Sequence, residues 1–224
     1  MNFINKELII FDLDGTLIDS VPDLALSVNH TLKSINRDLF PEDTIRTWVG
    51  NGAATLVKRA LSQSATINDD IDDKLFEKAL DIFLKFYSNN LTVSTILYDG
   101  VKETLENLQN NNYRLAIVTN KPYDFIEPIL ECLELSDLFE YYIGGDSLEV
   151  KKPNPMPLLH VCEKLNVSVE NSLMIGDSKN DIIAANDANM DSIALSYGYN
   201  YDEDISTYEP NIVFDNFADI NKVL

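Results

Sequence analysis

The sequence predicts an α/β fold: a doubly wound, mostly parallel, Rossmann-like sheet with helices on both faces, plus an inserted α-helical cap domain. The first observation is that short apolar runs alternate with helical patterns from Asp99 onward, which is typical of a parallel sheet. The second is the gap between the apolar runs at 8–11 and 114–119. It spans about a hundred residues, where a βαβ unit needs about thirty. We therefore assign 1–17 and 96–224 to the core and 18–95 to the cap.

The chain opens with a buried strand and then enters the insert. Leu8, Ile9, Ile10 and Phe11 are four consecutive apolar residues, which is typical of a strand buried on both faces. In the insert, apolar residues recur every three or four positions, so we expect a small helical bundle there. Its predicted helices lie at 22–34, 42–49, 55–61 and 71–87.

The remainder of the chain continues the alternation. Helical spacing predicts helices at 100–112, 124–135, 155–165 and 181–188. Apolar runs predict strands at 114–119, 141–145, 172–176, 192–196 and 211–214. This order predicts parallel strands connected by helices that cover both faces of the sheet.

Composition excludes several classes of partner. The 224 residues include 37 acidic and 17 basic side chains, a formal charge of −20, which disfavours binding to nucleic acid or to anionic membranes. We find neither an export signal nor an apolar run near the ~20 residues of a membrane span. Cys132 and Cys162 form no close motif, as expected in a reducing compartment. We expect a cytoplasmic monomer or homodimer that acts on a small molecule.

Two carboxylates end the first strand. Asp12 and Asp14 are two residues apart, so their side chains are expected on one side of the chain, at the sheet edge where ligands bind in open α/β folds. Like charges 4 Å apart repel by roughly 4 kcal/mol at an effective dielectric near 20. The pair therefore needs a cation, a shared proton or a turn that separates the two groups. The alternative is an ordinary Asp-x-Asp-Gly turn.

Polar residues also follow other predicted strands. Thr119 and Asn120 end the strand at 114–119, Asp177 and Asp181 follow the strand at 172–176, and Lys152 precedes a helix. Because the carboxyl ends of parallel strands lie along one edge, we expect these five residues to form one site with the aspartates of the first strand.

The residue types at this site suit phosphoryl transfer. Asp12, Asp14 and Asp177 provide the oxygen ligands that Mg²⁺ prefers. A hydroxyl, an amide and an ammonium can bind phosphoryl oxygens. The carboxylates outnumber the single lysine, so an anionic substrate would be repelled unless a divalent cation were bound.

The motifs resemble those of a known family. Asp12–Thr16, Thr119–Asn120, Lys152–Pro153 and Gly176–Asp181 resemble the four ordered motifs of the haloacid dehalogenase superfamily, and the helical insert resembles its cap. The resemblance covers essentially the whole chain. It implies a Mg²⁺-dependent phosphomonoester hydrolase that forms an aspartyl-phosphate. Haloacid dehalogenation itself is disfavoured, since Asp14 and the metal ligands serve phosphate chemistry.

The resemblance also implies a role for each motif residue. Asp12 is expected to be the nucleophile, and Asp14 the group that protonates the leaving alcohol and then deprotonates water. The metal is expected on the Asp12 carboxylate, the Asp14 backbone carbonyl and Asp177. Thr119 and Asn120 are expected to bind the phosphoryl group, together with Lys152.

Several residues near the motifs leave alternatives open. Asp181 is expected to orient metal-bound water or Lys152. Either Lys151 or Lys152 could point inward, and the position before Pro153 favours Lys152. Lys121 is expected near the mouth of the site or on the solvated surface. In the cap, Trp48 either fills the small core or faces the substrate, and Arg46 is the nearest candidate for binding a substrate carboxylate.

The substrate is expected to be a small phosphorylated metabolite, and 2-phosphoglycolate is our best single expectation. Arg46–Gly52 and Tyr197–Asn200 are similar to stretches of bacterial superfamily members that act on it. The alternatives are another small phosphate ester or pyrophosphate, a phosphomutase that passes the phosphoryl group to a sugar hydroxyl, or a non-enzymatic switch phosphorylated on Asp12.

Overall fold

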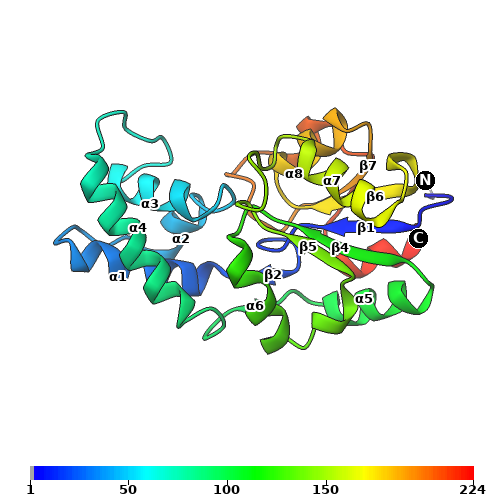
Figure 1. The fold of residues 1–224 in the computed structure, drawn as a ribbon, viewed down its shortest axis with the longest axis horizontal. Helices are drawn as coiled ribbons and strands as arrows, with labels where there is room; N and C mark the ends of the chain where they lie inside the picture. The colour runs from blue at the N-terminus through cyan, green and yellow to red at the C-terminus, as the bar shows by residue number, and fades with distance from the viewer. Residues whose placement is uncertain (1–2) are drawn as a thin grey trace.

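A six-stranded parallel sheet forms the centre of the computed structural model, which describes residues 3–224 (Figure 1). Its strands, in spatial order, are β5 (Tyr141–Ile143), β4 (Arg114–Val118), β1 (Leu8–Phe11), β6 (Ser172–Gly176), β7 (Asp191–Leu195) and β8 (Ile212–Phe214). All five neighbouring pairs are parallel. The predicted fold class is therefore confirmed, and β1 lies between two strands that come from later in the chain.

Alternate residues of β1 pack against opposite helical layers. Leu8 and Ile10 share a core with helices α7 (Met156–Leu165) and α8 (Lys179–Asp187). Ile9 and Phe11 pack on the other side, where α5 (Val101–Asn110), α6 (Ile126–Cys132) and the 3-10 helix η5 (Phe217–Lys222) lie (Figure 1). All four side chains are fully buried. This explains why the strand has no alternation of polar residues.

The helical insert lies beyond the carboxyl ends of the strands, on the left of Figure 1. It contains α1 (Val21–Ser34), α2 (Glu42–Arg46), α3 (Ala53–Ser62) and α4 (Asp73–Ser88). Each overlaps a predicted helix, and α2 ends three residues earlier than expected. No helix in the described part of the chain is both long and apolar enough to cross a bilayer.

A two-stranded ribbon connects the insert to the sheet. β2 (Ile18–Asp19) pairs antiparallel with β3 (Ile96–Leu97), so the chain enters and leaves the cap side by side. This ribbon is not predicted from the sequence, because two residues are too few to show alternation. Next to it, the fully buried Asp23 of α1 accepts hydrogen bonds from the backbone N–H groups of Ser94 and Thr95. The connection that leaves the cap is thereby tied to the first cap helix.

Candidate active site

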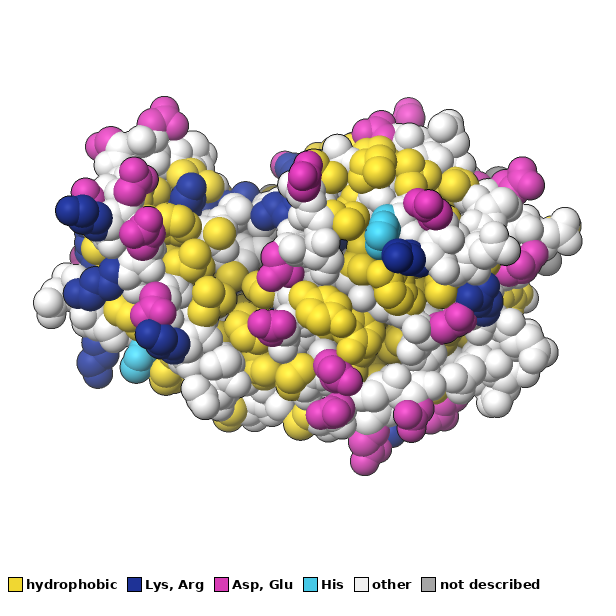
Figure 2. Space-filling view, in the orientation of Figure 1, with side chains coloured by type: hydrophobic (Ala, Val, Ile, Leu, Met, Phe, Trp, Pro, Cys, Tyr) yellow, Lys and Arg dark blue, Asp and Glu magenta, His cyan; other side chains and the backbone are white. Residues whose placement is uncertain are grey.

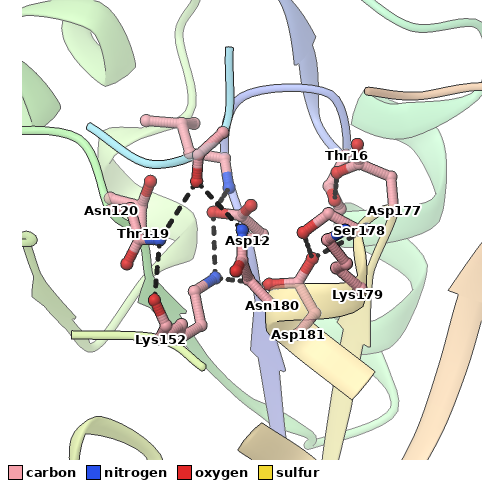
Figure 3. Close-up of polar contacts among 12 residues, drawn as sticks. Asp12, Thr16, Thr119, Asn120, Lys152, Asp177, Ser178, Lys179, Asn180 and Asp181 are labelled. Atoms are coloured by element: carbon pink, nitrogen blue, oxygen red, sulfur yellow. Dashed lines mark hydrogen bonds and ion pairs between the residues drawn. The ribbon is translucent and has the colours of Figure 1, made fainter. Parts of the chain in front are cut away.

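The ends of β1, β4 and β6 bring the predicted residues together at one edge of the sheet (Figure 3). Asp12 follows β1 and lies beside β6, since its N–H donates to the Ile175 carbonyl at 3.0 Å. Thr119 and Asp177 directly follow β4 and β6. All the predicted core residues of the site except Asp14 are buried: Asp12, Thr119, Asn120, Lys152, Asp177 and Asp181.

Asp12 is a carboxylate held in a largely dry environment. Its Oδ1 accepts the N–H of Leu13 at 2.7 Å and lies 3.1 Å from Lys152 Nζ. Burial raises the pKa of Asp12 to about 7, and the attraction of Lys152 offsets only part of this effect. The charges of Asp181 and Asp14 raise the pKa further. The ionised form of Asp12 therefore depends on nearby positive charge.

Lys152 provides part of that charge and is positioned by Asp181. Its Nζ lies 2.6 Å from Asp181 Oδ1, and its side chain is 1% exposed. The other oxygen of Asp181 accepts the N–H and hydroxyl of Ser178, in a capping box at the start of α8. Lys151 instead reaches the Asn51 carbonyl of the cap at 2.6 Å. The inward-pointing lysine is thus Lys152, as the sequence favoured, and the expected contact between Asp181 and Lys152 is present.

Asp177 lies in a cradle made by the Gly15 turn and the loop after β7. It accepts the Thr16 hydroxyl and the Tyr199 N–H, each at 2.6 Å. A Cβ atom at Gly15 would lie 2.3 Å from Asp177 Oδ2, and one at Gly198 would lie 2.2 Å from it. Glycine is therefore needed at both positions for the backbone to approach this carboxylate. No role of its own was predicted for Thr16, although this residue directly follows the glycine of the first motif.

Three carboxylates of the site are close enough to share one cation. One oxygen each from Asp12, Asp177 and Asp181 lies within 4.8 Å of the others. Burial raises the pKa of Asp177 well above its ordinary value, and the charges of Asp181 and Asp12 add to this. One lysine against three buried carboxylates leaves excess negative charge, so the donor set fits a hard divalent cation.

The Asp14 carboxylate faces a different set of partners from the Asp12 carboxylate. It accepts the Ser20 hydroxyl at 2.5 Å, and Lys121 Nζ lies 2.8 Å from Oδ1 and 3.1 Å from Oδ2. The Asp14 carboxylate is therefore separate from the group of three oxygens that Asp12, Asp177 and Asp181 provide. The repulsion expected between Asp12 and Asp14 is relieved because each has its own lysine.

Lys121 is buried and lines the pocket, so of its two expected positions the one on the solvated surface is wrong. It is only 4% exposed, and its Nζ also donates to the Tyr87 hydroxyl of α4 at 2.7 Å. Burial by itself lowers the pKa of Lys121, but the neighbouring Asp14 and Tyr87 raise it above the ordinary lysine value. The sequence could not show this, since a lysine after a strand is more often on the surface.

Thr119 and Asn120 have separate environments. The Thr119 hydroxyl oxygen accepts the Lys121 N–H at 3.2 Å, so its own O–H remains able to donate to a ligand. Asn120 Nδ2 donates to the carbonyls of Gly50 and Lys152, each at 3.0 Å. In this structure the Asn120 amide group therefore connects the cap to the Lys152 loop.

The loop at 50–52 holds the cap against the sheet edge. The Gly50 carbonyl accepts hydrogen bonds from Asn120 and also from Asn180, at 3.2 Å. Gly52 has φ +84°, and a Cβ there would lie 2.7 Å from the Asn120 carbonyl oxygen. The backbone of this loop therefore approaches the sheet edge closely.

The two other cap candidates have structural partners. Trp48 is buried and packs edge-on against Phe40, with ring centroids 5.0 Å apart. Arg46 contacts Asp19 at 3.1 Å and Glu42 at 3.1 Å. Of the two readings of Trp48, the structure supports a role in the cap core, and Arg46 does not line the pocket in the described part of the chain.

The cap lies closed over a small cavity. Its volume of about 30 Å³ is much smaller than the roughly 300–1,000 Å³ of pockets that hold a small-molecule ligand. Asp12, Asp14, Thr119 and Lys121 line its core side, whereas the cap side is mainly apolar and includes Leu24, Val49, Leu56, Phe83 and Tyr87. A groove of about 530 Å³ adjoins it between cap and core, and Figure 2 shows the surface hollowed between these two parts. Entry of a substrate therefore requires the cap to move.

We expect Mg²⁺ to raise the melting temperature more at pH 8 than at pH 6. Without metal, the pKa of Asp12 is about 7 in the folded protein against an ordinary value of 3.8. Between pH 3.8 and about 7, the folded state keeps a proton on Asp12 that the unfolded state has lost. The free energy of unfolding therefore falls as the pH rises through this window. A divalent cation binds the ionised carboxylates and offsets that loss. Thermal unfolding with and without Mg²⁺ at both pH values measures this. Equal shifts at pH 6 and pH 8 would contradict the expectation.

The chain is similar to known proteins over nearly its whole length. The family model described as "Haloacid dehalogenase-like hydrolase" matches residues 9–195. A phosphoglycolate phosphatase of Colwellia psychrerythraea is 54% identical over 98% of this chain and 97% of its own length. One from Psychrobacter arcticus is 46% identical over 96% and 94%. The crystal structure of a predicted phosphoglycolate phosphatase from Haemophilus somnus has a TM-score of 0.91 and 41% identity, covering 98% of both chains.

Proposed function

Since the chain belongs to the haloacid dehalogenase-like hydrolase family, we propose that it hydrolyses 2-phosphoglycolate to glycolate and phosphate through an aspartyl-phosphate on Asp12. The observation that carries the proposal is the position of Asp12. This buried carboxylate lies 3.1 Å from Lys152 and lines a closed pocket together with Asp14 and Thr119. The similar phosphoglycolate phosphatases, matched over nearly the whole chain, support the choice of substrate.

In the first step, an Asp12 oxygen attacks phosphorus in line with the ester bond. A phosphorus–oxygen bond forms to Asp12 while the bond to the ester oxygen breaks. Asp14 gives its proton to the departing glycolate oxygen, which leaves as an alcohol. Lys152 counters the negative charge around Asp12, and the free O–H of Thr119 is available to a phosphoryl oxygen.

In the second step, water attacks the phosphorus of the aspartyl-phosphate. Asp14, now a carboxylate, removes a proton from that water, and Asp12 is released together with inorganic phosphate. The same group therefore acts first as acid and then as base. The hydrogen bond from Ser20 and the contact with Lys121 hold it in place for both steps.

We infer that Mg²⁺ is the cation held at the acidic group. The Asp12 and Asp177 carboxylates would hold it, with the Asp14 backbone carbonyl as the family resemblance implies and with Asp181 close by. When bound, the ion supplies positive charge to the phosphoryl oxygens. The oxygen-only donor set supports Mg²⁺ over softer metals.

We further propose that the helical insert works as a lid that opens about the β2–β3 ribbon, with the domains divided as the sequence predicts, at 17/18 and 95/96. The closed pocket supports this, because a substrate can enter only if the cap moves away from the core. The hydrogen bonds from Asn120 and Asn180 to the Gly50 carbonyl join cap and core in the closed form and would break when the lid opens. Unpaired Cys132 and Cys162 fit the expected reducing cytoplasm. A monomer or homodimer remains our prediction.

The test is a phosphate-release assay over small phosphate esters and pyrophosphate with Mg²⁺ present. We expect the highest kcat/KM for 2-phosphoglycolate, with glycolate and phosphate formed in equal amounts. Hexose phosphates are included, with sugar isomers quantified in parallel. Isomer formation without phosphate release would indicate a phosphomutase. No phosphate release from any ester would overturn the proposal.

A further inference from the structure

Lys121 is a buried cation on the pocket wall, and its only part in the two steps described above is to hold Asp14 in place. Its side chain is 2% exposed, and its Nζ lies 2.8 Å from Asp14 Oδ1. Nζ also lies 4.8 Å from the centroid of the Tyr87 ring, in addition to its hydrogen bond with the Tyr87 hydroxyl. Among the described residues that line the pocket, it is the only lysine or arginine.

The positive charge beside the nucleophile comes from another residue. Lys152 contacts Asp12 and Asp181, on the side of the site where the acidic group fits a cation. Lys121 lies on the side of Asp14 instead. An ammonium has three N–H donors, and in this structure they reach the Tyr87 hydroxyl at 2.7 Å and the two Asp14 oxygens at 2.8 and 3.1 Å. A ligand carboxylate beside Lys121 would replace the longest of these contacts, the one to Asp14 Oδ2, and leave the other two in place.

We propose that Lys121, with the Tyr87 hydroxyl beside it, binds a carboxylate that the substrate carries on the carbon next to its ester oxygen. This rests on the proposed function, and it assigns the residues that recognise the acid end of the substrate, a phosphomonoester of a small 2-hydroxy acid. The ester oxygen must come within hydrogen-bond reach of Asp14 to receive its proton, and Lys121 lies one hydrogen bond beyond Asp14. A carboxylate one carbon from the ester oxygen falls beside that ammonium.

The surroundings make such a cation necessary for an acidic substrate. Leu24, Phe83 and Phe125 line the pocket near Tyr87, and a carboxylate buried against them without a counter-charge is strongly disfavoured. Arg46 cannot take this role where it stands, since its guanidinium contacts Asp19 and Glu42. Tyr87 belongs to α4 of the cap, so closure of the cap completes the subsite.

The first test needs only the unmodified protein and two substrates of equal size. These are 2-phosphoglycolate and its amide, phosphoglycolamide, which replaces the carboxylate with a neutral group. We expect kcat/KM to be at least tenfold higher for the carboxylate. Equal kcat/KM values would overturn the inference while leaving the phosphatase activity intact. Hydrolysis of neither substrate would instead overturn the proposed function.

The second test compares the selectivity of variants, measured as the ratio of kcat/KM for the two substrates. Lys121→Gln is expected to lower this ratio at least tenfold, Tyr87→Phe to lower it by a smaller factor, and Lys121→Arg to retain a preference for the carboxylate. Any general effect on Asp14 cancels in the ratio. An unchanged ratio in Lys121→Gln would mean that Lys121 only positions Asp14, which overturns the inference. If Lys121→Gln does not fold, the Tyr87→Phe ratio and the comparison in the unmodified protein decide the outcome.

Discussion

Asp12→Asn is expected to lower kcat for phosphate release by about 10⁴-fold or more, the order of loss seen when a nucleophile is removed from its catalytic unit. The amide keeps the size and shape of the carboxylate but cannot form the acyl-phosphate. Lys152 keeps its 2.6 Å contact with Asp181, so its charge stays paired. Phosphate release from 2-phosphoglycolate with Mg²⁺ measures the change.

The same substitution is expected to stabilise the metal-free protein at pH 8. Asp12 carries a pKa of about 7 in place of 3.8, so its ionisation opposes folding by up to about 4 kcal/mol at pH values above both. A neutral amide removes that cost. If Asp12→Asn melts at a higher temperature than the unmodified protein and yet is inactive, the loss of activity comes from the missing carboxylate and not from misfolding.

A matched control for Asp12→Asn is Asp43→Asn, which makes the same chemical change at an exposed position in the first turn of α2. It should leave both activity and melting temperature close to those of the unmodified protein. Substantial activity remaining in Asp12→Asn would contradict the assigned nucleophile.

Much of the site could be predicted because it depends on the backbone alone. In a parallel sheet, residues that follow β1, β4 and β6 must meet at one edge, whatever rotamers they adopt. Asp12, Thr119 and Asp177 are brought together for this reason. Lys152 could be placed by its neighbour Pro153, although it lies on no strand.

The rest depends on contacts between distant side chains. Lys121 follows a strand exactly as a surface lysine would, and only Asp14 and Tyr87, 107 and 34 residues away, explain its burial. Arg46 resembled a ligand-binding cation because its partner Asp19 lies 27 residues earlier in the chain. Sequence patterns report which face a residue lies on, but not which partner its side chain reaches.

Asp14→Asn is expected to have the second largest effect, and its size should depend on the leaving group. For 2-phosphoglycolate, whose alkoxide needs a proton, we expect kcat/KM to fall by about 10²- to 10⁴-fold. For p-nitrophenyl phosphate the first step should be affected much less, because nitrophenolate leaves without protonation. The second step still needs a base, so the aspartyl-phosphate should accumulate.

Rapid mixing of Asp14→Asn with p-nitrophenyl phosphate should therefore give a burst of nitrophenolate close to one equivalent per active site, followed by slow turnover. Ser20→Ala is the matched comparison, since it removes the hydrogen bond to Asp14 Oδ1 but keeps the carboxylate, so no burst is expected. Equal losses for both substrates without a burst in Asp14→Asn would mean that Asp14 holds Lys121 and Ser20 in place but transfers no proton. A burst seen with p-nitrophenyl phosphate but not with 2-phosphoglycolate would show that Asp14 serves both steps in turn. If Asp14 acted only as the acid, its loss would leave hydrolysis of the aspartyl-phosphate unimpaired, and no burst would appear.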